Sequence, residues 1–284
     1  MANIDLFVCV IDGTSEYAEL TKKISSKLLS NKHNVNWKYI ISGSVKRPPD
    51  GYELAGKVNF KKKYNVSFNH GVALNEADRL STEKYVIMLD TDFIFLIKDW
   101  DDIIVRNLDN NIVFGVDTPA EVNRAHNFPF IYCFCYRRDL LKNIKLDFRP
   151  RVNKDGDNLR FDIVSTERER KVMGMPMGSK YRWETSSRIP FIFYDNNLRS
   201  KAITCVLGYS EKVKLPFLTK KDKKKYMQDV KKSKASKEYM EEWHYKGKLF
   251  ATHLRGSIRH GINGYIPQYW LRRIKEYLKV EYSL

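Results

Sequence analysis

The first part of the chain alternates short apolar segments with segments of helical spacing. The apolar run from Ile4 to Ile11 predicts a strand, and apolar residues at about every fourth position from Glu16 to Leu29 predict a helix. The same reasoning gives further elements along the chain. We expect strands at 37–41, 57–60, 85–89, 112–116 and 130–136, and helices at 69–80 and, over a short stretch, at 138–143.

One of these segments, Tyr85 to Leu89, is apolar throughout and is followed directly by Asp90-Thr91-Asp92. A continuously apolar strand is typical of a sheet that is buried on both faces. Alternation of such strands with helices predicts an α/β fold with a mostly parallel central sheet flanked by helices. Ligands bind such sheets at the carboxyl ends of the strands, where the two aspartates are expected.

Composition narrows the class of protein. With 43% hydrophobic and 30% charged residues in 284, the chain should fold rather than remain disordered. The net charge of +17 would attract nucleic acid, an anionic membrane or phosphorylated small molecules, and is equally consistent with a basic surface that has no dedicated partner. Four scattered cysteines, the lack of an N-terminal signal pattern and the lack of an apolar run of ~18 residues favour a cytoplasmic protein.

The chemistry of Asp90-Thr91-Asp92 admits two interpretations. Two carboxylates one residue apart can hold one hard cation, Mn²⁺ or Mg²⁺, and such an ion bridges phosphate oxygens. The same tripeptide also occurs often in turns, where aspartates bind backbone amides. The segments around it decide between these interpretations.

Three segments carry a resemblance to a known family. Asn69 to Ala77 is a helical segment with small residues that precedes the strand ending in Asp90-Thr91-Asp92, and Phe134 to Leu141 and Trp183 to Arg188 follow later. Together they resemble the family 2 glycosyltransferases and their relatives of the GT-A fold, over about residues 4 to 200. The resemblance implies a Rossmann-related α/β fold with an elaborated C-terminal acceptor region.

That resemblance also implies an organisation and an activity. Residues 1–116 would form the nucleotide-sugar-binding half, and residues 117–284 the acceptor-binding half with a basic C-terminal extension, within one continuous catalytic domain. The reaction would transfer a sugar from a nucleoside diphosphate, UDP- or GDP-linked, to an acceptor hydroxyl with inversion. The acceptor would be a carbohydrate, a lipid-linked molecule or a protein.

Site residues follow by matching this chain to the family pattern. Asp90, Asp92 and His253 would hold the metal ion, and Glu184 would be the base that deprotonates the acceptor. Glu184 could equally be a surface partner of Arg182 or Arg188. The residues expected to contact the nucleotide or its diphosphate are Asp12, Thr14, Tyr17, Asn69, Arg255, Ser257 and Arg259, and the other acidic candidates for the base are Asp155, Asp157 and Asp162.

One segment departs from the family. Members commonly place an acidic residue after the second strand, where it contacts the base or ribose, whereas this chain has Ile41-Ser42-Gly43-Ser44. Asp12, Thr14 and Tyr17, which follow the first strand, are the pocket residues expected in its place.

Two other functions remain as alternatives. A nucleotidyltransferase acting on a sugar phosphate would also use two aspartates and a metal, although the chain has no Gly-rich phosphate loop. A basic nucleic-acid-binding protein would use the charge and the aromatic residues, although no specific nucleic-acid motif is found. A further hypothesis is peripheral membrane contact through the lysine-rich segment 220–237 and nearby aromatic residues, namely Trp243, Tyr245, Tyr269 and Trp270.

Overall fold

A computed structural model of the chain describes residues 1–60, 64, 66–118, 125–126, 128–152, 161–207, 239–255 and 268–282. The lysine-rich segment 220–237 lies outside the described residues, as do Asp155 and Asp157. Among the residues that are described, no helix combines the length and apolar character needed to cross a membrane.

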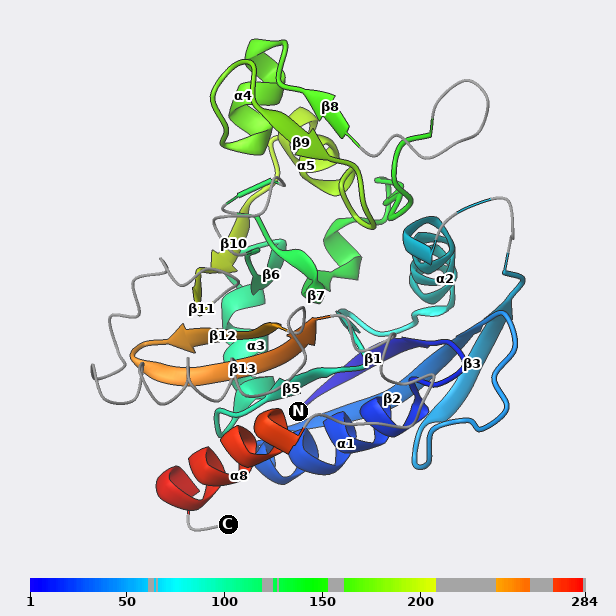
Figure 1. Cartoon of the computed structure of the whole chain (residues 1–284), viewed down its shortest axis with the longest axis vertical. Helices are drawn as coiled ribbons and strands as arrows, with labels where there is room; N and C mark the ends of the chain where they lie inside the picture. Colours follow the sequence, from blue (N-terminus) through cyan, green and yellow to red (C-terminus); the bar gives the residue numbers. More distant parts are fainter. Residues whose placement is uncertain are drawn as a thin grey trace.

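A seven-stranded sheet forms the centre of the molecule (Figure 1). The third strand in its order, β7, runs antiparallel to both of its neighbours, and the other pairs are parallel. The sequence-based expectation of an α/β fold with a mostly parallel central sheet is therefore confirmed. In spatial order the strands are β10 (Ser200–Ile203), β6 (Val113–Val116), β7 (Phe130–Arg137), β4 (Tyr85–Leu89), β1 (Ala2–Val10), β2 (His33–Ser42) and β3 (Glu53–Val58).

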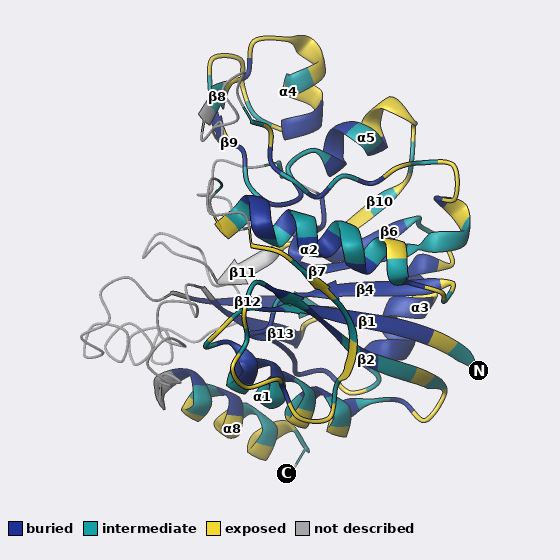
Figure 2. Ribbon diagram, turned by 90° about the vertical axis from the view of Figure 1, so that its right-hand side faces the viewer, coloured by how far each residue is buried: buried dark blue, intermediate teal, exposed yellow. Residues whose placement is uncertain are grey.

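Helices cover both faces of this sheet. Figure 2 shows α2 above the sheet and α1 and α8 below it. The fully buried Ala73 and Ala77 on α2 leave little side chain between helix and sheet, so the helix can lie close to the strands. The helices are α1 (Ser15–Ser25), continued by the 3₁₀ turn η1 (Ser26–Leu28), then α2 (Val66–Leu80), α3 (Trp100–Leu108) and α8 (Gln268–Tyr282).

A second, antiparallel sheet joins the C-terminal part of the chain to the loop after β4. Its strands, in order, are β11 (Cys205–Leu207), β12 (Tyr239–Tyr245), β13 (Lys248–Arg255) and β5 (Phe93–Phe95). In the register, His253 lies opposite Phe93 on one side and Glu241 on the other. Because β5 begins directly after Asp92, this pairing brings residues from the C-terminal part of the chain to the two aspartates.

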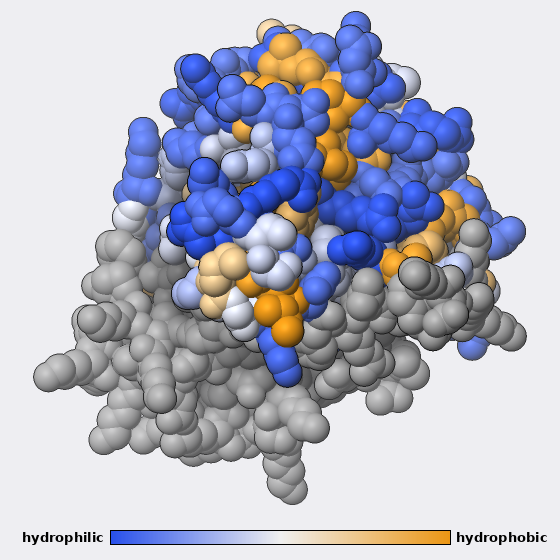
Figure 3. Space-filling view, turned by 90° about the horizontal axis from the view of Figure 1, so that it is seen from above, coloured by the Kyte–Doolittle hydropathy of each residue, from blue (hydrophilic) through white to orange (hydrophobic). Residues whose placement is uncertain are grey.

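A small unit with its own core lies at the top of the molecule in Figure 1. Its helix α4 begins with a capping box between Thr166 and Glu169 and ends at Gly174, whose φ of 64° suits glycine. Seen from above, this face is largely hydrophilic around a limited hydrophobic group (Figure 3). The elements of the unit are β8 (Phe161–Ile163), α4 (Glu167–Met173), β9 (Lys180–Arg182) and α5 (Ile189–Asp195).

The expected elements agree best with the structure where strands are buried. Strand β4 has the predicted bounds, whereas the strand expected at 57–60 is β3, which begins four residues earlier at Glu53. It is an edge strand with Leu54 about half exposed (52%), so its apolar pattern is weak. The short helix expected at 138–143 is the single 3₁₀ turn η2 (Arg138–Leu140).

Candidate active site

The two aspartates lie in a turn that backbone contacts hold at the carboxyl end of β4. The Asp90 N–H donates to the carbonyl of Tyr132, 3.1 Å away, and the Thr21 hydroxyl on α1 donates to the carbonyl of Thr91 at 2.7 Å. Thr91 and Asp92 are buried, with exposed fractions of 7% and 4%. The turn is thus held by strand β7 on one side and by helix α1 on the other, and these contacts fix the direction of its carboxylates.

His253 completes a cluster of three side chains with metal-binding atoms. Its Nε2 lies 3.3 Å from Asp92 Oδ1 and 3.6 Å from Asp90 Oδ2. One ligand atom from each of the three residues falls within 4.8 Å of the others. Two carboxylates and one imidazole form a set of ligands that suits Mn²⁺, and Mg²⁺ can bind the two carboxylates. The residues fit the expected cation, and their assignment as its ligands remains a prediction.

The two imidazoles next to Asp90 are affected differently by their surroundings. Burial lowers the pKa of His253, but the carboxylates of Asp92, Asp90 and Glu241 outweigh it and hold that pKa well above its usual value. His70 Nε2 lies 3.7 Å from Asp90 Oδ1. Here burial prevails over the attraction of the two aspartates, so the pKa of His70 is lowered. The carboxylates thus face one imidazole that favours a positive charge and one that favours neutrality.

Two residues that surround His253 were missed by the sequence analysis. Glu241 is fully buried, and its Oε2 lies 2.7 Å from His253 Nδ1. The Tyr132 ring stacks on the imidazole with centroids 4.1 Å apart, and the Trp243 ring lies 6.4 Å away. The available signal was an acidic pair, Glu241-Glu242, inside a segment that is otherwise aromatic and apolar.

Glu184 lies in a segment attached to the start of α2. Its Oε1 is 2.7 Å from Arg182 Nε, and its side chain is 16% exposed, so the ion pair considered as an alternative role is present. The next residue, Thr185, donates from its N–H to Ser67 Oγ at 2.6 Å and from its hydroxyl to the Ser67 carbonyl at 2.8 Å. Ser67 and His70 are one turn apart on α2, where side chains are about 5–6 Å from each other. Helix α2 therefore connects the Glu184 segment to Asp90.

A partly buried carboxylate, that of Asp147, fixes this segment from the other side. Asp147 accepts from Arg149 Nε at 2.8 Å, from Asn75 Nδ2 at 3.2 Å and from Arg188 Nη1 at 3.1 Å. Burial raises the pKa of Asp147, but the hydrogen bonds from Arg149 and Asn75 outweigh it and lower the pKa to about 2. The carboxylate joins α2, its own loop and the residue that precedes α5.

The backbone beside Asp147 packs directly on α2. The Phe148 N–H donates to Asn75 Oδ1 at 2.9 Å, and the Phe148 carbonyl accepts from the Ser186 N–H at 2.6 Å. A Cβ at Gly71 would lie 2.6 Å from that carbonyl oxygen, so only glycine allows this approach. The small residues on α2 are thus explained by close packing of the helix against its neighbours.

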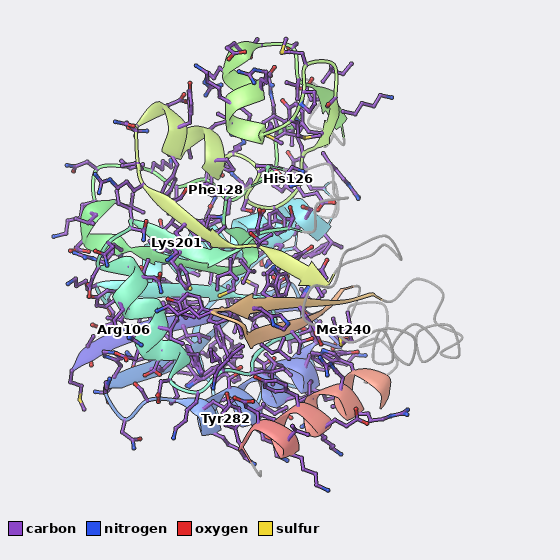
Figure 4. All side chains as sticks on the ribbon, turned by 90° about the vertical axis from the view of Figure 1, so that its left-hand side faces the viewer. Arg106, His126, Phe128, Lys201, Met240 and Tyr282 are labelled. Carbon is purple, nitrogen blue, oxygen red and sulfur yellow. The ribbon has the colours of Figure 1, made fainter. Side chains whose placement is uncertain are left out.

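A pocket opens next to the Glu184 segment, between the start of β7, the end of α4 and the start of α5. Figure 4 shows Phe128 and His126 at this junction between the upper unit and the central sheet. The lining is mainly apolar, with two hydroxyls from the residues that follow Glu184. It consists of Ala125, Phe128, Pro129, Phe130, Met173, Ser186, Ser187 and Pro190.

The expected nucleotide contacts are spread over several environments. Asp12 is about half exposed, and its Oδ1 accepts from the Lys46 N–H at 3.4 Å, so the loops after β1 and β2 meet there. Thr14 closes the first of these loops through its hydroxyl, which donates to the carbonyl of Ile11. Both residues follow β1 at the carboxyl edge of the sheet, and their role as nucleotide contacts stays a prediction.

Other expected contacts lie deeper or outside the described residues. Tyr17 is fully buried in a core cluster, with its ring 6.4 Å from that of Trp270, and Asn69 is 1% exposed with its amide donating to the carbonyl of Tyr64. The backbone of Arg255 ends β13, but its side chain is not described, and Ser257 and Arg259 lie outside the described residues. Asp162 lies on β8, where its carboxylate is 3.5 Å from Arg151 Nη1 and 3.4 Å from Trp183 Nε1.

Comparison with known proteins gives matches among solved structures alone. No protein-family model matches the sequence, and no curated protein matches it. Galactosyltransferase LgtC, in complex with donor and acceptor sugar analogs, is 10% identical with a TM-score of 0.37, and the match covers 49% of this chain and 59% of LgtC. Mannosyltransferase PcManGT from Pyrobaculum calidifontis, in complex with GDP-Man and Mn²⁺, is 14% identical with a TM-score of 0.37, covering 81% of this chain and 60% of that one.

A third similar structure comes from an animal. It is a variant of Drosophila beta-1,4-galactosyltransferase 7 in complex with manganese, UDP-Gal and xylobiose, 10% identical with a TM-score of 0.40, and the match covers 71% of this chain and 65% of that one. The chain thus spans about three fifths of the length of the first structures that it matches, 59% and 60%.

Proposed function

We propose that the protein is a metal-dependent glycosyltransferase that moves a sugar from a UDP- or GDP-linked donor to an acceptor hydroxyl. The observation that carries the proposal is the cluster of Asp90, Asp92 and His253 at the carboxyl edge of the central sheet. This edge is where α/β sheets bind their ligands. The segments around the aspartates, which resemble those of family 2 glycosyltransferases, support the same reaction.

The roles of the charged residues follow from the bonds that change. A bound Mn²⁺ or Mg²⁺, held by Asp90, Asp92 and His253, would offset the negative charge of the donor diphosphate. As the acceptor oxygen forms its bond to the anomeric carbon, the bond from that carbon to the diphosphate oxygen breaks, and the acceptor proton passes to the carboxylate of Glu184. A positioned base of this kind contributes roughly 10²–10⁴-fold to the rate.

Inversion requires the acceptor and the diphosphate to lie on opposite sides of the sugar. We propose inversion on the resemblance to family 2 glycosyltransferases; the attachment of Thr185 to Ser67 ties the Glu184 segment to α2, which also carries His70 next to Asp90.

Binding measurements test the proposal before any acceptor is known. The thermal unfolding midpoint is measured with UDP- and GDP-sugars, with and without Mn²⁺. A ligand at 100 times its Kd stabilises the native state by ~2.7 kcal/mol, so a specific donor gives a clear rise that depends on the metal. Asp92→Ala should abolish this rise, whereas Asp195→Asn, in an exposed ion pair with Arg168, should keep it. No metal-dependent rise with any donor would refute the proposal.

A further inference from the structure

Glu241 faces His253 from the neighbouring strand of the second sheet. The two residues are directly opposite in the β12–β13 register, a position at which side chains on one face lie in contact. The Glu241 side chain is fully buried, and its Oε2 is 2.7 Å from His253 Nδ1. Figure 4 labels the preceding residue, Met240, on this strand. Burying a carboxylate away from solvent is costly, so its presence beside His253 calls for an explanation.

The geometry of the imidazole supplies that reason. His253 Nε2 is directed at Asp92 and Asp90, at 3.3 and 3.6 Å. An imidazole that offers the lone pair of Nε2 to a metal ion carries its proton on Nδ1. That proton points to Glu241, which has no other role in the proposed reaction. The stacked ring of Tyr132, 4.1 Å away, limits rotation of the imidazole out of this orientation.

We infer that Glu241 is a positioning residue of the metal site, which fixes the tautomer and orientation of His253 and makes Nε2 a stronger donor. The inference rests on the proposed function, since it presumes that His253 binds the ion. Carboxylates that accept the second N–H of a ligating histidine typically contribute 10–100-fold to metal affinity.

Strand β12 also offers a matched control. The adjacent Glu242 is equally buried, at 1% exposed, but points to the other face of the strand, where its Oε1 is 2.9 Å from Arg273 Nε. Glu242→Gln therefore removes a buried carboxylate of the same strand without touching His253. It separates an effect on the metal site from a general effect on the sheet.

The experiment measures Mn²⁺ affinity directly, by the loss of the free-ion signal in electron paramagnetic resonance titrations. Glu241→Gln and Glu241→Ala should each raise the Kd for Mn²⁺ about 10–100-fold, with the larger effect for alanine, because glutamine still accepts from Nδ1. Glu242→Gln should keep the wild-type Kd. Equal Kd values for wild type, Glu241→Gln and Glu241→Ala would overturn the inference, and if the alanine variant does not fold, the glutamine variant decides.

A second measurement distinguishes positioning from packing. Nitrogen-15 spectra of the histidine rings with Mg²⁺ should show His253, assigned with His253→Gln, as a single Nδ1-protonated tautomer in the wild type and as a mixture in Glu241→Ala. An unchanged tautomer would overturn the inference. If instead wild-type protein binds no Mn²⁺ at all, the proposed function itself fails, and the two failures are distinguishable.

Discussion

Replacement of Asp147 by asparagine tests how the Glu184 segment is held. The pKa of this carboxyl is about 2, against an ordinary value of 3.8, because Arg149 and Asn75 bind its charged form. The difference of roughly 1.8 units corresponds to at most ~2.4 kcal/mol at 1.36 kcal/mol per unit. The Asp147 side chain is 14% exposed, so solvent screening reduces this free-energy contribution. We expect Asp147→Asn to lose about 1–2 kcal/mol of unfolding free energy at pH 7.

The pH dependence gives the sign of the effect. A carboxyl with a depressed pKa stabilises the native state above its unfolded pKa of about 3.8, and this contribution is lost as the pH falls through about 2. The difference in unfolding free energy between wild type and variant, measured by urea denaturation, should therefore be constant from pH 5 to 7 and decrease between about pH 4 and 2. Asp195→Asn, which removes an exposed ion pair, should show a much smaller gap at pH 7. Equal stability of Asp147→Asn and wild type at pH 7 would refute the reasoning.

Three further predictions concern packing and chemistry. Gly71→Ala should lower the unfolding free energy by about 1–3 kcal/mol, because its Cβ would meet the Phe148 carbonyl at 2.6 Å; a stability equal to wild type in urea denaturation would contradict this. Thr166→Ala, which removes the cap of α4, should cost about 1 kcal/mol in the same assay, and Thr166→Ser should restore most of it. Glu184→Gln should lower kcat roughly 10²–10⁴-fold while donor binding in the thermal-shift assay stays unchanged, and an unaltered kcat would exclude Glu184 as the base.

The part of the site that could be predicted is the part that is local in sequence. Asp90 and Asp92 follow a strand whose five residues are all buried, so the pattern gave both the strand and its end. Glu241 and Tyr132 could not be found in this way, because their place next to His253 depends on the register of β12 with β13 and on the pairing of β7 with β4. No local pattern encodes either pairing.

Tyr17 shows the same limit of local patterns. Its side chain is fully buried in a core cluster that includes Trp270 of α8, while its role as a nucleotide contact stays a prediction. The sequence pattern of α1 shows which positions are apolar, but the helix that covers them begins some 250 residues later, and a contact over that separation is invisible to local spacing. The α/β class, in contrast, depends on the alternation of elements and was recovered.

The pairing of β13 with β5 has a consequence for how the site is made. Asp92 and His253 are separated by about 160 residues, and His253 reaches the aspartates only when the C-terminal hairpin pairs with the short strand after them. Contacts of such long separation cost loop-closure entropy and form late. During synthesis the central sheet has its β1, β2 and β4 strands long before residue 253 has been made. The three-residue cluster would therefore be completed at the end of folding, so that a nascent or truncated chain carries the two aspartates without the histidine.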